Sequence, residues 1–145
     1  METSGKPTKT FKAKRDLYYT NDHEWIDFQG SVAYIGICPF KLSGIKQIEK
    51  IEFSEEDNLK KCGEVVASII YDDYKIDVHM PVNGKIISIN DAILSGNENI
   101  VLQEPETAGY IALIVPTSPY DRQGLTISEK YRMTSKTSNY IFLCT

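Results

Sequence analysis

Apolar and polar residues alternate in a series of short stretches, with turn residues between them. Each stretch has six to eight residues and is rich in β-branched and aromatic side chains, which is typical of β-strands. The stretches are residues 22–29, 31–37, 46–53, 64–71, 75–80, 84–89 and 109–115. Two short helices are also expected, one over residues 40–48, interrupted by Gly44, and one after Ser128, a good N-cap followed by an acidic residue. The pattern predicts a mainly all-β fold with small helical additions.

Two pairs of stretches predict β-hairpins. The first pair, residues 22–29 and 31–37, meets at Gly30. The second meets at a two-residue turn, Asp72-Asp73, so its tip is expected to be exposed, acidic and braced by two tyrosines. The predicted pairs are Tyr71 with Tyr74, Ile69 with Ile76 and Ala67 with Val78 on an apolar face, and Ile70 with Lys75, Ser68 with Asp77 and Val66 with His79 on a mixed face. Because Asp-Asp suits this turn less well than Asp-Gly, a type I turn with a shifted register is the alternative.

Length and composition limit the class of protein. The chain has 145 residues, 41% hydrophobic and 25% charged, which are ordinary values for one globular domain. No stretch approaches the roughly 20 apolar residues of a membrane-spanning helix, so no membrane span is expected. The net charge of -4 argues against nucleic acid as the main partner, because phosphate binding favours a basic face on the folded body.

The distribution of charge suggests how the chain is divided. Residues 1–15 hold five basic side chains against Glu2, a local charge of +4 that leaves -8 on the remainder. We expect residues 1–17 to form a basic flexible arm, which is either a solvated terminus or docks on an acidic partner or a membrane surface. Residues 18–133 are the expected folded domain. In the extension 134–145, the apolar segment 140–143 is expected to fold back on the body or to join a neighbouring chain as an added strand.

The number and spacing of the three cysteines indicate the redox state of the cellular compartment. Cys38, Cys62 and Cys144 are an odd number, without the CxxC or CxxxC spacing of a zinc site. They indicate no disulfide framework and predict a protein of the reducing cytoplasm. Cys38 ends an apolar run and is expected to be a small buried hydrophobic residue.

A series of motifs covers the expected domain in a distinctive order. They are Tyr19-Thr20-Asn21-Asp22-His23-Glu24-Trp25-Ile26, Gly30-Ser31-Val32-Ala33-Tyr34-Ile35-Gly36-Ile37, Gly63-Glu64, Pro81-Val82-Asn83-Gly84-Lys85-Ile86, Asn90-Asp91-Ala92 and Gly109-Tyr110-Ile111-Ala112-Leu113-Ile114. In this order and spacing the chain resembles the H protein of the glycine cleavage system, a relative of the lipoyl and biotinyl carrier domains. The resemblance implies a barrel-sandwich hybrid of the lipoyl-carrier type with short peripheral helices.

The resemblance also implies a chemistry that depends on one lysine at the tip of the hairpin. Lipoate is attached to that lysine as a swinging arm, which takes an aminomethyl group from a pyridoxal-phosphate decarboxylase. The arm delivers the group to a tetrahydrofolate-dependent transferase and is reoxidised by a flavin dehydrogenase. The family lysine stands eight positions before the proline of the P-V-x-G motif, a position that is Asp73 in this chain. An aspartate has no amine with which to form the lipoyl amide, and Ile70 and Tyr71 replace the family's Glu and Ser.

Lys75 is the alternative attachment point. It lies two residues beyond Asp73, about 6.6 Å along a strand and on the same face. Attachment enzymes dock on the turn as a shape, so this displacement is expected to hinder them. The other interpretation is that Lys75 is a solvent-facing strand residue paired with the acidic tip.

Two histidine–acid pairs are candidates for catalytic or metal-binding groups. His23 and Glu24 are adjacent, and adjacent strand residues point to opposite faces, so they do not share one ligand. His79 with Asp77 is the second pair, and a hydrogen-bonded or surface histidine is expected in both places. The resemblance matches Asp77 to an acidic position that follows the family lysine.

No other motif indicates catalysis or metal binding. The acidic cluster Asp72, Asp73 and Asp77 lacks the glycine and distal glutamate of a calcium loop. The sequence has no glycine-rich phosphate loop, GxSxG motif or Cys/His dyad. We therefore expect no catalytic residue and no metal site.

The sequence thus predicts a non-catalytic, H-protein-like module without lipoate or another cofactor, which acts by protein–protein contact. Glycine-cleavage-like enzymes are the candidate partners. The expected interaction surface is the hairpin tip, made of Tyr71, Asp72, Asp73, Tyr74 and Asp77. The alternative is a working aminomethyl or acyl carrier with lipoate on Lys75, whereas an independent enzyme has no support in the motifs.

Overall fold

The computed structural model describes residues 17–54 and 59–117 and the backbone of residues 126–127. The expected basic arm up to residue 16, the helix after Ser128 and the C-terminal extension lie outside the described residues. Among the described helices, none is long and apolar enough to cross a membrane.

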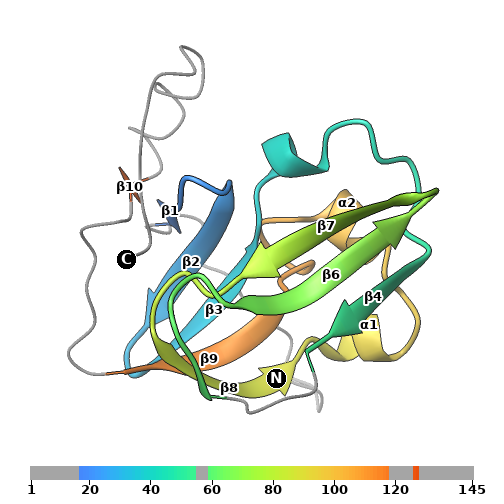
Figure 1. The fold of residues 1–145 in the computed structure, drawn as a ribbon. Coiled ribbons are helices and arrows are strands. Elements are labelled where there is room, and N and C mark those ends of the chain that lie inside the picture. Colours follow the sequence, from blue (N-terminus) through green and yellow to red (C-terminus); the bar gives the residue numbers. More distant parts are fainter. Residues whose placement is uncertain (1–16, 55–58, 118–125, 128–145) are drawn as a thin grey trace, which may run out of the picture.

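The described chain is built mainly of short strands in two antiparallel sheets (Figure 1). A seven-stranded sheet has the order β10-β1-β2-β3-β9-β8-β5, and a three-stranded sheet has the order β4-β6-β7. The strands are β1 (Tyr18–Tyr19), β2 (Glu24–Gln29), β3 (Val32–Ile37), β4 (Lys50–Phe53), β5 (Leu59–Lys60), β6 (Val65–Tyr71), β7 (Tyr74–His79), β8 (Gly84–Ile89), β9 (Ala112–Pro116) and β10 (Thr126–Ile127). The mainly all-β prediction is therefore confirmed.

The core lies between the two sheets. Strands of both sheets contribute buried apolar side chains to one cluster, among them Ile26, Ile35, Ile69, Val78 and Ile114. In β3, for example, Ala33, Ile35 and Ile37 all join this cluster, so the strand turns alternate residues inward, as the period-two pattern of the sequence predicts. A smaller cluster on the other face of the seven-stranded sheet holds Leu17, Tyr19, Trp25, Cys38 and Tyr110.

The helices differ from the prediction. Residues 40–48 do not form a helix: one 3₁₀ turn, η1 (Pro39–Leu42), is followed by a loop in which Gly44 has a φ of +88°. That backbone conformation is left-handed and ends the helical turn. Two single-turn helices, α1 (Asp91–Leu94) and α2 (Ile100–Gln103), were not predicted. Asn90 caps α1 by accepting a hydrogen bond from the backbone N–H of Ala92 at 3.0 Å.

The β6–β7 hairpin has the predicted register from the tip to the pair Ala67–Val78. The alternative of a shifted register is wrong, because Asp72 accepts a φ of +49° and allows the two-residue turn. The predicted pair Val66–His79 is also wrong. A bulge makes Val65 the partner of His79, so that Val66 turns into the core at 1% exposure.

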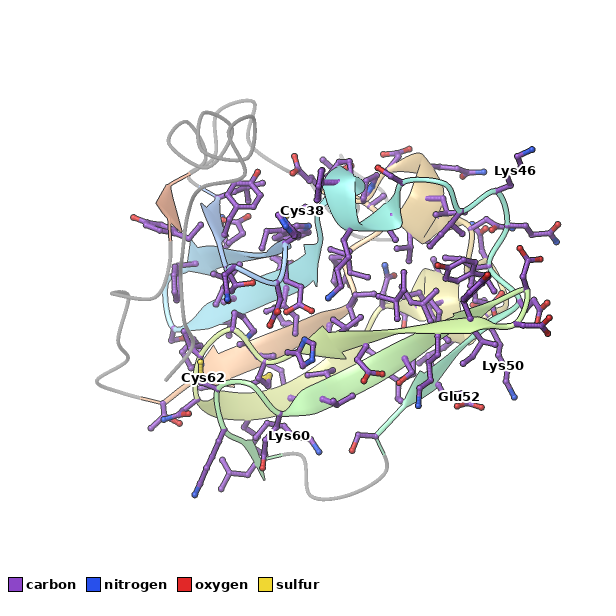
Figure 2. All side chains as sticks on the ribbon, turned by 45° about the horizontal axis from the view of Figure 1, so that its top comes forward. Cys38, Lys46, Lys50, Glu52, Lys60 and Cys62 are labelled. Carbon is purple, nitrogen blue, oxygen red and sulfur yellow. The ribbon has the colours of Figure 1, made fainter. Side chains whose placement is uncertain are left out.

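Of the two cysteines that the structure describes, one follows the prediction and one does not. Cys38 is buried, as expected of a small hydrophobic residue. Cys62, labelled with Cys38 in Figure 2, is disulfide-bonded. The cysteine spacing had predicted no disulfide, and at Cys62 that prediction is wrong.

The β2–β3 hairpin depends on one glycine. Gly36 lies directly opposite Trp25, whose ring is fully buried. A Cβ at Gly36 would lie 2.7 Å from the ring Nε1, which itself donates a hydrogen bond to the carbonyl of Pro105 at 3.0 Å. Only a residue without a side chain leaves room for the indole.

We expect Gly36→Ala to lower the free energy of unfolding by about 1–3 kcal/mol, because it overpacks the indole of Trp25. Urea unfolding measures the change. Ser31→Ala, at an exposed position of the same hairpin, is the control and is expected to stay within about 0.5 kcal/mol of the parent chain. Equal stability of Gly36→Ala and the parent would contradict the packing described.

Candidate functional site

The hairpin tip lies at one end of the molecule, at the right of Figure 1. Asp72 and Asp73 are both exposed, and the side chain of Tyr74 is 65% exposed. The rings of Tyr71 and Tyr74 stand 5.6 Å apart between their centroids, next to the turn. The tip therefore presents two carboxylates beside an aromatic pair, as the sequence predicted.

Two other candidates lie further down the same hairpin. Lys75 is exposed on β7, opposite Ile70, and forms no ion pair within the described part of the chain. The expected pairing of Lys75 with the acidic tip is therefore not seen there. Asp77 lies in mid-strand opposite Ser68, whose hydroxyl donates to the Asp77 carboxylate at 2.8 Å. Asp77 is thus engaged within the hairpin, away from the turn.

A polar cluster fixes the base of the hairpin, and we call it the Glu24 clasp: the side chains of Glu24, Lys41 and His79. The Glu24 carboxylate is buried at the start of β2. Its Oε2 accepts hydrogen bonds from the Lys41 ammonium at 2.7 Å and from the backbone N–H of His79 at 2.9 Å. The imidazole Nδ1 of His79 lies 3.0 Å from the same oxygen.

Lys41 makes a second contact in the clasp, a hydrogen bond of 2.8 Å to the carbonyl oxygen of Asp77. Strand β7 is the outer strand of its sheet. Lys41 and Glu24 therefore satisfy one acceptor and one donor on the backbone of this strand, as a neighbouring strand would. Through them η1 and β2 are joined to the hairpin.

The two histidines behave differently. The Glu24 carboxylate raises the pKa of His79 by hydrogen bonding, against the opposing effect of burial. His23 has a φ of +61° and its ring lies 4.4 Å from the ring of Phe40 between centroids. Burial, and next the charge of Lys41, lower the pKa of His23. His79 contacts Glu24 rather than Asp77, the acid with which the sequence pairs it.

The geometry bears on metal binding and catalysis as well. Donor atoms of Asp22, Glu24 and His79 lie within 4.8 Å of one another. The ammonium of Lys41 already lies against Glu24, however, and supplies the positive charge that a buried carboxylate requires. We therefore interpret the cluster as an ion-pair network. A cavity of about 230 Å³ beside β4, β6 and β8 is lined by apolar and serine side chains and offers no titratable group.

The sequence of the chain is similar to those of known proteins. The family model described as glycine cleavage H-protein matches residues 17–138. The probable glycine cleavage system H protein of Aeropyrum pernix is 30% identical over 121 residues, which cover 83% of this chain and 84% of that protein. The glycine cleavage system H protein of Bacteroides fragilis is 30% identical over 118 residues, which cover 81% and 93%.

A solved structure agrees in fold. The crystal structure of a glycine cleavage system H protein from Mycobacterium marinum superposes with a TM-score of 0.68. The match covers 87% of this chain and 99% of that one, at 20% sequence identity. The predicted all-β fold of the lipoyl-carrier type is thereby confirmed.

We expect Lys41→Met to lower the free energy of unfolding by about 3 kcal/mol, because breaking a buried pair leaves an uncompensated charge on Glu24. Thermal or urea unfolding near neutral pH measures the loss. The matched control is Lys50→Met. Lys50 forms an exposed ion pair of 2.9 Å with Glu52 on β4 (Figure 2). No measurable change is expected there, and an equal loss in both variants would contradict the special role of Lys41.

Proposed function

The chain belongs to the glycine cleavage H-protein family, and we propose that it is a member without lipoate that acts through protein contacts of its hairpin tip. Membership makes it a carrier-type protein with no catalytic activity of its own. The observation that carries the proposal is the exposed position of Asp73 in the turn. The resemblance implies, by spacing from Pro81, that the family's lipoyl lysine would stand at this position.

The chemistry of attachment supports the absence of lipoate. A lipoyl amide requires a nucleophilic amine at a site that the attachment enzyme reaches. The tip offers access, because Asp72 and Asp73 are exposed at the end of a two-residue turn. It offers carboxylates in place of an amine, so a lipoate ligase that docks on the turn has no group to acylate.

A carrier modified at Lys75 is the second candidate, and one observation favours it. The Lys75 side chain is exposed, two residues from the turn. Its side chain lies on the strand, however, about 6.6 Å from the apex residue along β7. A swinging arm at that point would start from the flank of the hairpin.

The tip has the features of a small docking surface. Asp72 and Asp73 are exposed in the turn between Tyr71 and Tyr74, whose rings lie next to each other, and aromatic residues are enriched where proteins bind one another. A complementary surface would carry Lys or Arg side chains around an apolar patch. We propose that this complementary surface belongs to enzymes of the glycine cleavage type. Residues 18–133 would dock, and the arm 1–17 and the extension 134–145 would be appendages.

We expect the parent chain to keep its unmodified mass when it is co-expressed with a lipoate ligase in the presence of lipoate. Intact-mass spectrometry and peptide mapping of residues 63–84 provide the measurement. A lipoylated H protein from the family, expressed in the same cells, is the positive control. Asp73→Lys is expected to gain the lipoyl group, because its amine would stand at the apex. A lipoyl group on Lys75 of the parent chain would overturn the proposal.

We further expect an excess of the chain to slow a glycine cleavage reaction that depends on a lipoylated H protein, because the two compete for the same enzymes. Asp72→Asn combined with Asp73→Asn should weaken this inhibition several-fold. Glu64→Gln combined with Asp91→Asn removes the same charge at exposed positions outside the tip and serves as the control. Equal inhibition by both double variants would show that the tip is not part of the docking surface.

A further inference from the structure

The Glu24 clasp has a feature that lipoylation or docking does not explain: its net charge depends on one histidine. We propose that Glu24, Lys41 and His79 form a proton-controlled clasp, which fixes the base of the β6–β7 hairpin to β2 when His79 is protonated and loosens it when His79 is neutral. The inference goes beyond the proposed function, because it holds with or without lipoate.

In the Glu24 clasp, the hydrogen bonds to Glu24 meet at a single acceptor atom. Oε2 of Glu24 receives the Lys41 ammonium, the His79 backbone N–H and the His79 imidazole. These donors come from η1 and β7, whereas the carboxylate comes from β2. Oε1 of the same carboxylate is buried and has no hydrogen-bond partner in the described part of the chain. The hold of β2 on the hairpin therefore depends on how strongly one oxygen attracts its donors.

Among the residues that the structure describes, three charged groups face His79. Glu24 lies on β2, Asp22 precedes it with its Oδ2 at 3.5 Å from the imidazole Nδ1, and Lys41 lies on η1. On β6, the residue opposite His79 is the uncharged Val65. With His79 protonated, two cations balance two carboxylates. With His79 neutral, one negative charge is left over beside a buried carboxylate.

The direction of the pH effect follows from this arrangement. Hydrogen bonding to Glu24 raises the pKa of His79 above the ordinary value of 6.5, although burial and the charge of Lys41 oppose the rise. A group whose pKa is raised on folding stabilises the fold fully below its unfolded pKa. That stabilisation is lost as the pH rises through the folded pKa. The clasp is therefore closed in mildly acidic solution and loosens on the alkaline side of 6.5.

Amide hydrogen exchange of β7 tests the proposal. The His79 N–H is itself a clasp donor, so its protection factor, corrected for the intrinsic pH dependence of exchange, reports closure. In the parent chain we expect a several-fold fall in this factor between about pH 6 and about pH 8.5. The chain has only two histidines. His23→Asn should therefore keep the fall, and His79→Asn, which places an amide N–H near the position of Nδ1, should abolish it.

A constant protection factor in the parent chain, or the same fall in His79→Asn, would overturn the proposal. The imidazole titration of His79 in the parent, followed by NMR, remains decisive if His79→Asn does not fold. We expect the His79 ring to titrate above the value of the denatured chain. Lys41→Met should raise the pKa of His79 further, because the Lys41 charge lowers it. A ring that titrates at or below the denatured value would overturn the clasp.

Discussion

The buried carboxylate of Glu24 is the group on which the contacts between β2, η1 and the β6–β7 hairpin depend. Glu24 precedes Trp25 in a strand that is buried on both faces, so its charge requires compensation from within the protein. Removing an ion from water costs several kcal/mol even after relaxation, and only close, hydrogen-bonded partners offset that cost. Lys41 and His79 are these partners. Lys41 lies on η1 and His79 lies on β7. Compensation of the Glu24 charge therefore holds both segments against β2.

The contacts of the β6–β7 hairpin also fix the position of its tip. Its base is held by the clasp and its inner face is anchored in the core by residues such as Ile69 and Val78. The two-residue turn therefore lies at the end of a hairpin supported at its base and along its inner face, at a distance from the seven-stranded sheet (Figure 1). In our proposal the chain keeps the scaffold of a lipoyl carrier and changes the reactive end. The function then depends on the side chain at position 73, since an amine there is a point of attachment and a carboxylate is only a surface for contact.

Local patterns in the sequence were sufficient to predict the strands and much of the hairpin. Alternation with period two and the position of the turn were enough for the hairpin register, because a slip of one residue would expose Ile69 and Val78. The bulge at Val65 was not predicted, because Val65, Val66 and Ala67 are all apolar and the pattern there is compatible with either register. Helices α1 and α2 have four residues each and are too short for a helical period. The pattern of residues 40–48 was misleading, because a single 3₁₀ turn ends before Gly44. The contact between Glu24 and His79 joins residues 55 apart on different sheets, and no local pattern of residues indicates it.

The central claim is that the chain has the fold of a carrier without the capacity to carry. Its most direct test is glycine cleavage with this chain as the sole carrier, after co-expression with lipoate ligase and lipoate. Release of carbon dioxide from glycine, coupled to transfer of the one-carbon unit, measures carrying. The account predicts a rate no greater than that of the reaction without any carrier protein, alongside full turnover with a lipoylated H protein of the family. Sustained turnover that depends on the parent chain would contradict it.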